Sequence, residues 1–389
     1  MSTDRRSFLR TAALAPLAAA WPALARAAAS SASSMLVLVE LKGGNDGLNT
    51  VIPYADGRYA GLRPRLAIAR DQVVQLTEQA GLHPSLAPLR APWDARELAI
   101  VQGVGYPQPN LSHFRSIEIW DTGSRSDEYL DTGWIARAFA RAPRPAGLAA
   151  DGVVIGNAGM GPLAGRGIRA LSLASPEQFL RNAKLARDEG QASANPALAH
   201  VLQVERDIVA SARRIIPSRA FEQVFPAGPF GAAVNTTAQL AANPSGVAVV
   251  HVSLGSFDTH ANQLGTHAAL LRQLAEGLLA LRGALQEIGR WDSTVVATYS
   301  EFGRRPRENL SNGTDHGTAS AHFVMGGAVR GGLYGPQPAL DRLDGNGNLA
   351  HAVDLRAYYA TLLAQCWDIH PRTVFGAEYE ALPVFKKSV

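Results

Sequence analysis

The chain has 389 residues, of which 47% are hydrophobic and 18% are charged, and its formal net charge is +4 at neutral pH. The basic surplus is concentrated before residue 29, where four arginines face one aspartate, so the rest of the chain is close to neutral. No cluster of lysine or arginine with interleaved aromatics follows, which excludes nucleic acid as an expected ligand. Cys366 is the single cysteine, which excludes an internal disulfide and a cysteine-based metal site.

The amino terminus has the pattern of a targeting peptide. Arg5 and Arg6 precede an apolar stretch from Thr11 to Leu24, and small residues follow. This order predicts a twin-arginine signal peptide over residues 1–29, removed by cleavage between Ala25 and Ser30. We therefore expect the twin-arginine translocase to export the chain to the periplasm or out of the cell. No later stretch has the length of a spanning helix, so no stable membrane span is expected after processing.

The remainder, residues 30–389, shows apolar runs of strand length, each followed by a polar loop. The runs are Met35–Leu41, Leu98–Val104, Val247–Leu254, Val295–Tyr299 and His322–Met325. Continuous rather than alternating hydrophobicity indicates strands that are buried on both faces, as in a mostly parallel sheet covered by helices. A long helical pattern, Asn262–Ile288, joins the third run to the fourth as a crossover. The sequence predicts a single α/β domain with a doubly wound, mostly parallel sheet and a helical insertion around 176–230.

Polar residues with catalytic or metal-binding chemistry follow these runs. In a doubly wound sheet, the ligand crevice lies beyond the carboxyl ends of the strands. The candidates, in chain order, are Asn45, Asp46, Ser112, His113, Asp258, His260, Glu301, Arg304, Asp315 and His316. Carboxylate oxygens and imidazole nitrogens are the ligands that a divalent ion takes when no thiolate is available. The sequence therefore predicts a site for one or two divalent ions, with zinc, manganese, calcium and magnesium as the alternatives.

Ser112 is the candidate nucleophile. It precedes a helical pattern, and the free amides and dipole of a helix amino terminus stabilise an arriving anion. A nearby metal ion would lower the pKa of the hydroxyl. The alternative is a plain helix cap, the commonest role of a serine at such a position. His113 follows Ser112 directly but would point to another face of the helix.

The other candidates also have structural alternatives. Asp46 before Gly47 is an ordinary turn pair, and Glu301 with Arg304 is compatible with a surface ion pair. Asp258 and His260 lie two residues apart, which on an extended loop places both on one side. Asp315 and His316 lie between glycine-bearing turns and match no standard core element.

Five short signatures carry a resemblance to a known family. They are Gly-Gly-Asn-Asp-Gly-Leu-Asn from Gly43, Ser-His-Phe from Ser112, Phe-Asp-Thr-His from Phe257, Tyr-Ser-Glu-Phe-Gly-Arg from Tyr299 and Gly-Thr-Asp-His-Gly from Gly313. In this order they resemble the exported twin-arginine family called domain of unknown function 1501. That family looks related to the alkaline phosphatase and sulfatase superfamily, whose fold holds a two-metal site at the strand ends.

The resemblance implies a ligand set for two metals. Asp46 and Glu301 would surround one metal together with Ser112, whereas Asp258, His260 and His316 would surround the other. The sequence departs from the superfamily pattern at Phe302, where an imidazole is expected, and in the short spacing from Asp258 to His260. A single metal or an altered pair is therefore an alternative to the full set.

The resemblance implies an exported, metal-dependent hydrolase of phosphate or sulfate esters. Ser112 would attack the ester, while Asn45, His113 and Arg304 would contact its oxygens. The expected substrate is a small anionic ester or a sulfated or phosphorylated polymer. The alternative is a non-catalytic secreted binding or assembly module that keeps the fold, which the phenylalanine at Phe302 favours.

Overall fold

The structure is a computed structural model that describes residues 34–142, 147–156, 159–173 and 219–386. The predicted signal peptide and its cleavage site lie outside the described residues, as does most of the predicted insertion around 176–230. In the described part of the chain, no helix is both long enough and apolar enough to cross a membrane.

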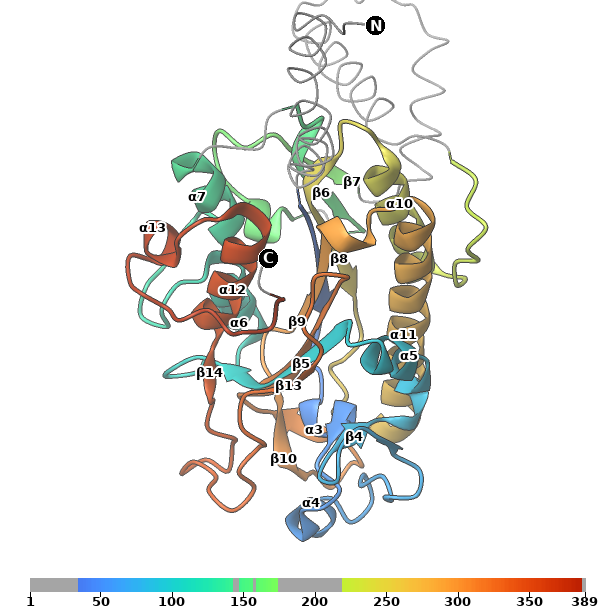
Figure 1. The fold of residues 1–389 in the computed structure, drawn as a ribbon. Coiled ribbons are helices and arrows are strands. Elements are labelled where there is room, and N and C mark those ends of the chain that lie inside the picture. Colours follow the sequence, from blue (N-terminus) through green and yellow to red (C-terminus); the bar gives the residue numbers. More distant parts are fainter. Residues whose placement is uncertain (1–33, 143–146, 157–158, 174–218, 387–389) are drawn as a thin grey trace, which may run out of the picture.

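A central sheet organises the described residues (Figure 1). Its strands, in spatial order, are β13 (Gly332–Tyr334), β5 (Leu98–Gly105), β12 (Ser320–Met325), β9 (Thr294–Tyr299), β1 (Met35–Leu41), β8 (Val247–Leu254), β6 (Ala150–Ile155) and β7 (Ala170–Leu173), with β14 (Val353–Asp354) also paired to β5. A hairpin of β10 (Arg304–Glu308) and β11 (Thr314–His316) and a small sheet of β2 (Val51–Ile52), β4 (Gly81–Leu82) and β3 (Val74–Gln75) lie outside it.

The helices flank this sheet. They are α3 (Gly47–Thr50), α4 (Gly57–Leu62), α5 (Arg90–Asp94), α6 (His113–Thr122), α7 (Trp134–Arg141), α10 (Pro229–Ala242), α11 (Gln263–Glu287), α12 (Leu355–Trp367) and α13 (Pro371–Phe375), with short 3₁₀ turns at Pro84–Leu89, Gly161–Leu163 and Trp291–Ser293. The predicted long helix is confirmed as α11, which connects β8 to β9.

The predicted strands are confirmed, and β1 lies between β8 and β9, parallel to both. β12 differs from its neighbours because it runs antiparallel to β5 and β9. The first residues of β12, rather than its last, therefore lie at the edge where β1, β8 and β9 end. The predicted α/β class with a mostly parallel sheet is confirmed, with this one reversed strand inside it.

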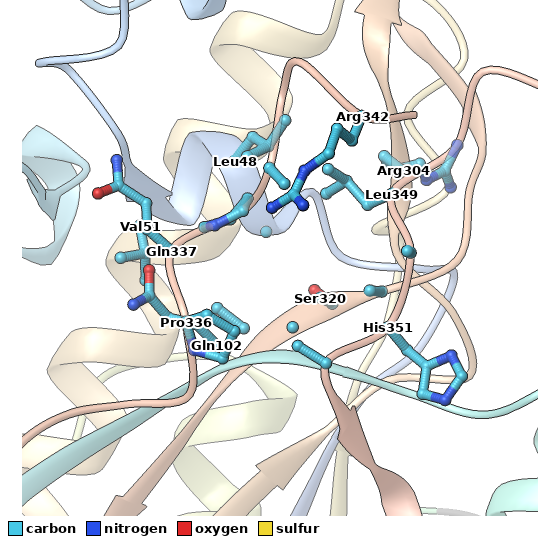
Figure 2. Close-up of a pocket in the computed structure, with 18 residues that line it drawn as sticks. Leu48, Val51, Gln102, Arg304, Ser320, Pro336, Gln337, Arg342, Leu349 and His351 are labelled. Carbon is cyan, nitrogen blue, oxygen red and sulfur yellow. The ribbon is translucent and has the colours of Figure 1, made fainter. Parts of the chain in front are cut away.

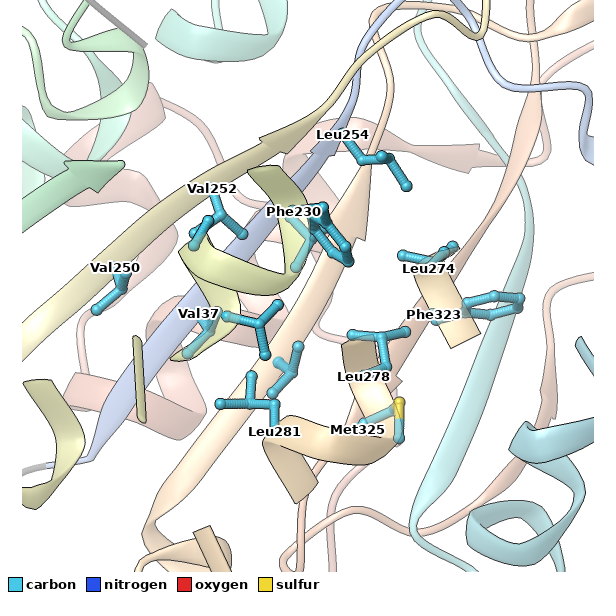
Figure 3. Packing of buried hydrophobic residues seen from close by; sticks show 14 of the residues in the cluster. Val37, Phe230, Val250, Val252, Leu254, Leu274, Leu278, Leu281, Phe323 and Met325 are labelled. Carbon is cyan, nitrogen blue, oxygen red and sulfur yellow. The ribbon is translucent and has the colours of Figure 1, made fainter. Parts of the chain in front are cut away.

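Two hydrophobic cores explain why the strands are apolar throughout. Alternate side chains of a strand point to opposite faces. Val37 and Val39 of β1 pack in the core beneath α10 and α11, which Figure 3 shows around Val37, Phe230 and Leu278. Leu36 and Leu38 pack in the other core with α6, α7 and α12. Figure 1 shows these two groups of helices on opposite sides of the sheet.

Two glycines let the loops at the strand ends approach each other. Gly43, after β1, has a φ of +115°, and a Cβ there would lie 2.5 Å from the Asp258 amide nitrogen. A Cβ on Gly313, before β11, would lie 2.2 Å from the carbonyl carbon of His260. Because only glycine fits at such distances, the loops after β1 and β8 and the β10–β11 hairpin can close around one small region.

Candidate metal centre

Side chains from separate segments meet at the carboxyl ends of β1, β8 and β9. His113 begins α6, Asp258 and His260 follow β8, and His316 ends β11. His113, Asp258 and His316 each place one ligand atom within 4.8 Å of the others, which makes them a possible metal-binding group. The structure thus brings together side chains that lie far apart in the sequence.

Asp258 is at the centre of this group. Its Oδ1 atom lies 3.0 Å from His260 Nε2 and 3.1 Å from His316 Nε2, and its Oδ2 atom lies 3.4 Å from His113 Nε2. Partial burial alone raises the pKa of Asp258, but the hydrogen bond and charge of Arg304 outweigh burial and lower that pKa to about 2. Asp258 is therefore an anion at neutral pH.

Hydrogen bonds orient two of the imidazoles so that Nε2 faces Asp258. His316 Nδ1 lies 2.8 Å from the Leu111 carbonyl oxygen, which only accepts, so Nδ1 carries the proton. His113 Nδ1 lies 3.0 Å from Glu301 Oε1, and a carboxylate likewise only accepts. These partners engage Nδ1 of both rings, and Nε2 is the ring nitrogen that faces Asp258.

The His260 ring brings a third nitrogen to the same place. Its Nε2 lies only 2.9 Å from His316 Nε2. His316 Nε2 therefore lies close to both this nitrogen and the Asp258 carboxylate, an arrangement that either a proton on an imidazole or a bound cation stabilises. Burial is the largest effect on the pKa of His316 and lowers it; the hydrogen bonds to Leu111 and Asp258 raise it and the charge of Arg304 lowers it, and the net shift is downward.

A metal ion satisfies the same atoms. Ligand atoms around a tetrahedral zinc ion, with bonds of about 2.0–2.1 Å, lie about 3.3 Å apart. The distances of 3.0–3.4 Å from the Asp258 oxygens to the three imidazoles, and of 2.9 Å between His260 Nε2 and His316 Nε2, are close to this spacing. The donor set therefore fits a divalent ion held by nitrogen and oxygen.

Glu301 lies behind His113 rather than among the facing ligand atoms. Its side chain is buried, and Oε1 accepts hydrogen bonds from the Gly43 amide at 2.8 Å and from His113 Nδ1. A carboxylate that holds the second nitrogen of a ligating histidine fixes the ring and raises its basicity. Glu301, predicted as a direct ligand, is thus placed to orient one.

Phe302 occupies the position where the resemblance leads one to expect an imidazole. Its ring centroid lies 4.4 Å from that of His316 and 5.0 Å from that of His113. The phenylalanine is buried and packs against both histidine rings. Within the described ranges, one group of potential ligands is found, made of His113, Asp258 and His316.

Arg304 is not available to a substrate. Its side chain is fully buried and donates to the carbonyl oxygens of Gly43, Gly44, Phe257 and Thr314. It also pairs with Asp258 Oδ1 at 2.5 Å. The prediction that Arg304 binds substrate is therefore wrong, because its donors are directed to backbone oxygens and to Asp258, and the arginine positions the aspartate instead.

Asp46 does not join the metal-binding group, which corrects a second prediction. Its carboxylate is completely buried, and Arg63 Nη1 lies 2.6 Å from Oδ2 and Arg63 Nη2 3.0 Å from Oδ1. Gln263 Nε2 donates to Oδ2 at 2.5 Å, and the amides of Leu48 and Asn49 donate to Oδ1, so Asp46 caps α3. Burial alone raises the pKa of Asp46, but the charge and hydrogen bonds of Arg63 outweigh it, and the pKa is lowered.

Asn45 is also structural. Its side chain bonds to Thr50 Oγ1 at 2.9 Å and to His267 Nε2 at 2.9 Å, and the residue is fully buried. A substrate therefore does not reach it, and the predicted contact is wrong. Asp315 remains at the edge of the group, where its Oδ1 atom lies 3.6 Å from His260 Nδ1.

Ser112 lies at the amino terminus of α6, next to His113, and is exposed. Its backbone amide donates to Asn110 Oδ1 at 2.9 Å. Its hydroxyl makes no capping hydrogen bond to the first turn of the helix. The simple helix-cap alternative therefore lacks the contact that defines it.

A cavity of about 360 Å³ opens beside the metal-binding group, and its walls add residues that the sequence did not single out. Besides His113, Asp258 and Glu301, it is lined by Glu40, Lys42, Phe114 and Ile117. Glu40 is a buried carboxylate inside an otherwise apolar strand. A charged residue in an apolar run could have marked it as a functional candidate. Burial raises the pKa of Glu40, outweighing its hydrogen bond from Ser253. Lys42 gave no signal, because a lysine just after a strand is ordinary.

A family model described as "Protein of unknown function (DUF1501)" matches residues 33–375. The chain belongs to this family. No curated protein matches the sequence.

Several solved structures resemble the fold. The C-terminal periplasmic domain of EcEptC from Escherichia coli, in complex with zinc, is 9% identical, with 92% of this chain and 88% of that chain covered and a TM-score of 0.42. The phosphonate monoester hydrolase SpPMH from Silicibacter pomeroyi is 10% identical, with 91% and 78% covered and a TM-score of 0.41. A protein of the alkaline phosphatase superfamily from Vibrio parahaemolyticus is 10% identical, with 88% and 69% covered and a TM-score of 0.41. Identity and TM-score are both low, so these resemblances carry nothing about the chemistry of this chain.

Proposed function

We propose that this protein is a metal-dependent hydrolase of phosphate or sulfate esters. The observation that carries the proposal is the convergence of imidazole nitrogens on the Asp258 carboxylate, with the Nδ1 atoms of His113 and His316 already bound elsewhere. Such a set of acceptors calls for a cation. Because the set contains several imidazoles, zinc or manganese suits it better than magnesium or calcium, which prefer oxygen ligands.

His113, His316, His260 and Asp258 would hold the ion, and Glu301 and Arg304 would position His113 and Asp258. A bound divalent ion supplies Lewis-acid stabilisation of the ester oxygens and lowers the pKa of a coordinated hydroxyl or water. Lys42 lines the adjoining cavity and provides a positive charge for the anionic ester. The proposed substrate is a phosphate or sulfate ester, either small or carried on a polymer.

Ser112 is the proposed nucleophile. It is exposed at the amino terminus of the ten-residue helix α6, and its neighbour His113 belongs to the metal-binding group. The helix dipole at this end favours the negative charge of the ester. Its hydroxyl is free of a capping bond and is available to attack.

One observation favours a second function. Within the described residues, the Ser112 hydroxyl makes no hydrogen bond to a group that could accept its proton. A nucleophilic serine normally has such a base within hydrogen-bond reach. A non-catalytic binding or assembly module that holds a metal for structural purposes would show the same geometry, so the experiment must separate metal binding from turnover.

The experiment starts from the full chain, expressed with added zinc or manganese, and measures metal content and hydrolysis of aryl phosphate and aryl sulfate esters. We expect bound metal and turnover in the parent. His316→Ala should lose most of the bound metal and most of the ester hydrolysis, because removing a direct ligand removes most of the metal affinity of an open site. The matched control is His370→Ala, an exposed histidine at the start of α13, which should keep both.

Ser112→Ala then tests the mechanism. Hydrolysis should fall by at least about a hundredfold while metal content stays at the parental level, because the methyl group cannot attack. Metal binding without turnover in the parent would support the binding module. A parent that takes up no metal under these conditions would contradict both functions.

A further inference from the structure

A second cavity, of about 400 Å³, lies on the other side of Arg304 from the metal-binding group. It is enclosed by α3 and the start of β2, by the facing ends of β5 and β12, and by the loop between β13 and β14 (Figure 2). Leu48, Val51 and Leu349 give it apolar walls. Its volume falls within the range of small-molecule sites, which are mostly apolar with a few polar groups.

Gln102 is a polar group of this cavity that has no use within the fold. It interrupts the apolar run of β5, and the residue is only 4% exposed. Its side chain makes no hydrogen bond to any other residue that the structure describes, although buried amides are normally paired. Because the side chain lines the cavity, its free donor and acceptor are available to a bound molecule.

Arg342 gives the cavity a positive charge. Figure 2 shows its guanidinium group between Leu48 and Leu349. The nearest carboxylate partner is Asp341, at 4.0 Å, and the arginine side chain is 83% exposed, so this ion pair is weak. No aspartate or glutamate is among the described residues that line the cavity, and Arg304, which also lines it, has its own charge paired with Asp258. The charge of the cavity therefore suits an anion.

From these features we propose that the cavity binds an apolar monocarboxylate, such as an aryl-substituted acetic acid. The apolar body would fill the space between Leu48, Val51 and Leu349, and the carboxylate would pair with Arg342, which matches a planar carboxylate with two donors. Gln102 would hydrogen-bond to a polar substituent of the ring. This inference is independent of the proposed hydrolase function.

The position of Arg304 links the two sites. The same guanidinium that lines this cavity pairs with Asp258 in the metal-binding group. Only the Arg304 side chain therefore separates an occupant of this cavity from the metal-binding group. The first cavity, lined by Lys42 and His113, would stay open.

The test uses 1-naphthylacetate as the probe and its neutral amide, 1-naphthylacetamide, as the uncharged analogue, with affinities measured by isothermal titration calorimetry on the full chain. The parent should bind the acid about two- to fivefold more tightly than the amide, as expected for one solvent-exposed ion pair. Arg342→Gln should remove that preference and leave the affinity for the amide unchanged. Because Arg342 is largely exposed, this variant should fold normally.

Two further variants test whether the probes bind in this cavity and not at the metal centre. Leu349→Trp, which fills the apolar space, should weaken both probes, with the fold checked by thermal unfolding. His316→Ala should bind the acid as the parent does, whereas loss of binding there would mean that the carboxylate binds at the metal and would overturn the proposal. Arg372→Gln, an exposed arginine of α13, is the matched control. No binding by the parent, or an unchanged preference for the acid in Arg342→Gln, would also overturn it.

Discussion

Two aspartates at neighbouring strand ends have opposite roles, although both sit in short polar motifs. Asp258 is partly exposed and faces three imidazoles. Asp46 is fully buried and is held by Arg63, whose side chain is also fully buried. The difference lies in the partner: an arginine with no access to solvent needs a permanent anion, and Asp46 supplies it.

This contrast leads to a prediction about stability. Asp46→Ala should lower the free energy of unfolding by about 3–5 kcal/mol, because it leaves the Arg63 charge buried without its partner. Asp315→Ala, an exposed aspartate, should cost no more than about 1 kcal/mol. Chemical denaturation of both variants measures the difference. A cost for Asp46→Ala as small as that of the control would show that the buried pair is not formed.

The pH dependence of the same pair follows from the sign of its pKa shift. The pKa of Asp46 is lower in the folded chain than in the unfolded chain. Its stabilisation is therefore complete above the unfolded pKa of about 3.9 and is lost as the pH falls through the folded value. Asp46→Asn should accordingly show a smaller loss of stability than the parent between neutral pH and acid, in denaturation curves recorded across that range.

At the scale of elements, the site depends on how closely the loops after β1 and β8 and the β10–β11 hairpin approach. Arg304, at the start of β10, accomplishes this by donating to backbone carbonyls of both loops. Gly43 provides the space because it has no side chain. Its amide also donates a hydrogen bond to Glu301 Oε1. The metal-binding group therefore requires these loops to pack against each other and against α6, because the loop after β8, the hairpin and α6 each carry only one or two of the ligands.

Gly43→Ala should test this arrangement. The residue has a positive φ and a Cβ would lie 2.5 Å from the Asp258 amide, so the two loops must separate. We expect a loss of about 2 kcal/mol or more in unfolding free energy, together with reduced metal content. Gly61→Ala, in α4, has nothing within 4 Å of the added methyl group and should be neutral or slightly stabilising. Full metal content in Gly43→Ala would contradict the proposed role of the loop contact.

At the scale of the whole molecule, the sheet separates two cores, and the proposed chemistry is confined to one of its edges. β1 lies in the middle and sends alternate side chains into both cores. The cavity with Gln102 and the metal-binding group both lie along the edge where β1, β8 and β9 end, on either side of Arg304. A folded, metal-loaded domain of this kind would suit a translocase that accepts folded proteins.

We propose that the full chain follows the twin-arginine route, on the basis of Arg5 and Arg6 ahead of an apolar stretch. Replacing both arginines by lysine should leave the precursor in the cytoplasm, because the pathway requires the guanidinium pair. Fractionation of cells expressing each form provides the measurement, with Arg10→Lys as the control that should still be exported. Export of the double variant at the parental level would contradict this proposal.

Much of the site could be predicted from the sequence, and the reasons for the failures are specific. Asp258, His260 and His316 were singled out because they follow buried strands or lie in short polar turns, and the structure brings them together. His113 was expected on another helix face, but the first turn of α6 directs it to Asp258. The predictions for Asp46 and Arg304 fail because the partners of these residues, Arg63 and Gln263 for Asp46 and the loop carbonyls for Arg304, meet them only in the folded chain.

The sequence by itself determined the strands, the long helix α11 and the glycine-rich loops, because burial on both faces, helical periodicity and positive φ leave local patterns in the chain. Tertiary structure alone decided the direction of β12, which of the carboxylates pairs with an arginine, and which imidazole nitrogens face one another. These features depend on contacts between segments far apart in the sequence. The protonation state of a residue and its role as a ligand depend on its neighbours in space. Those neighbours are brought together only when the loops pack, so a local sequence pattern does not reveal them.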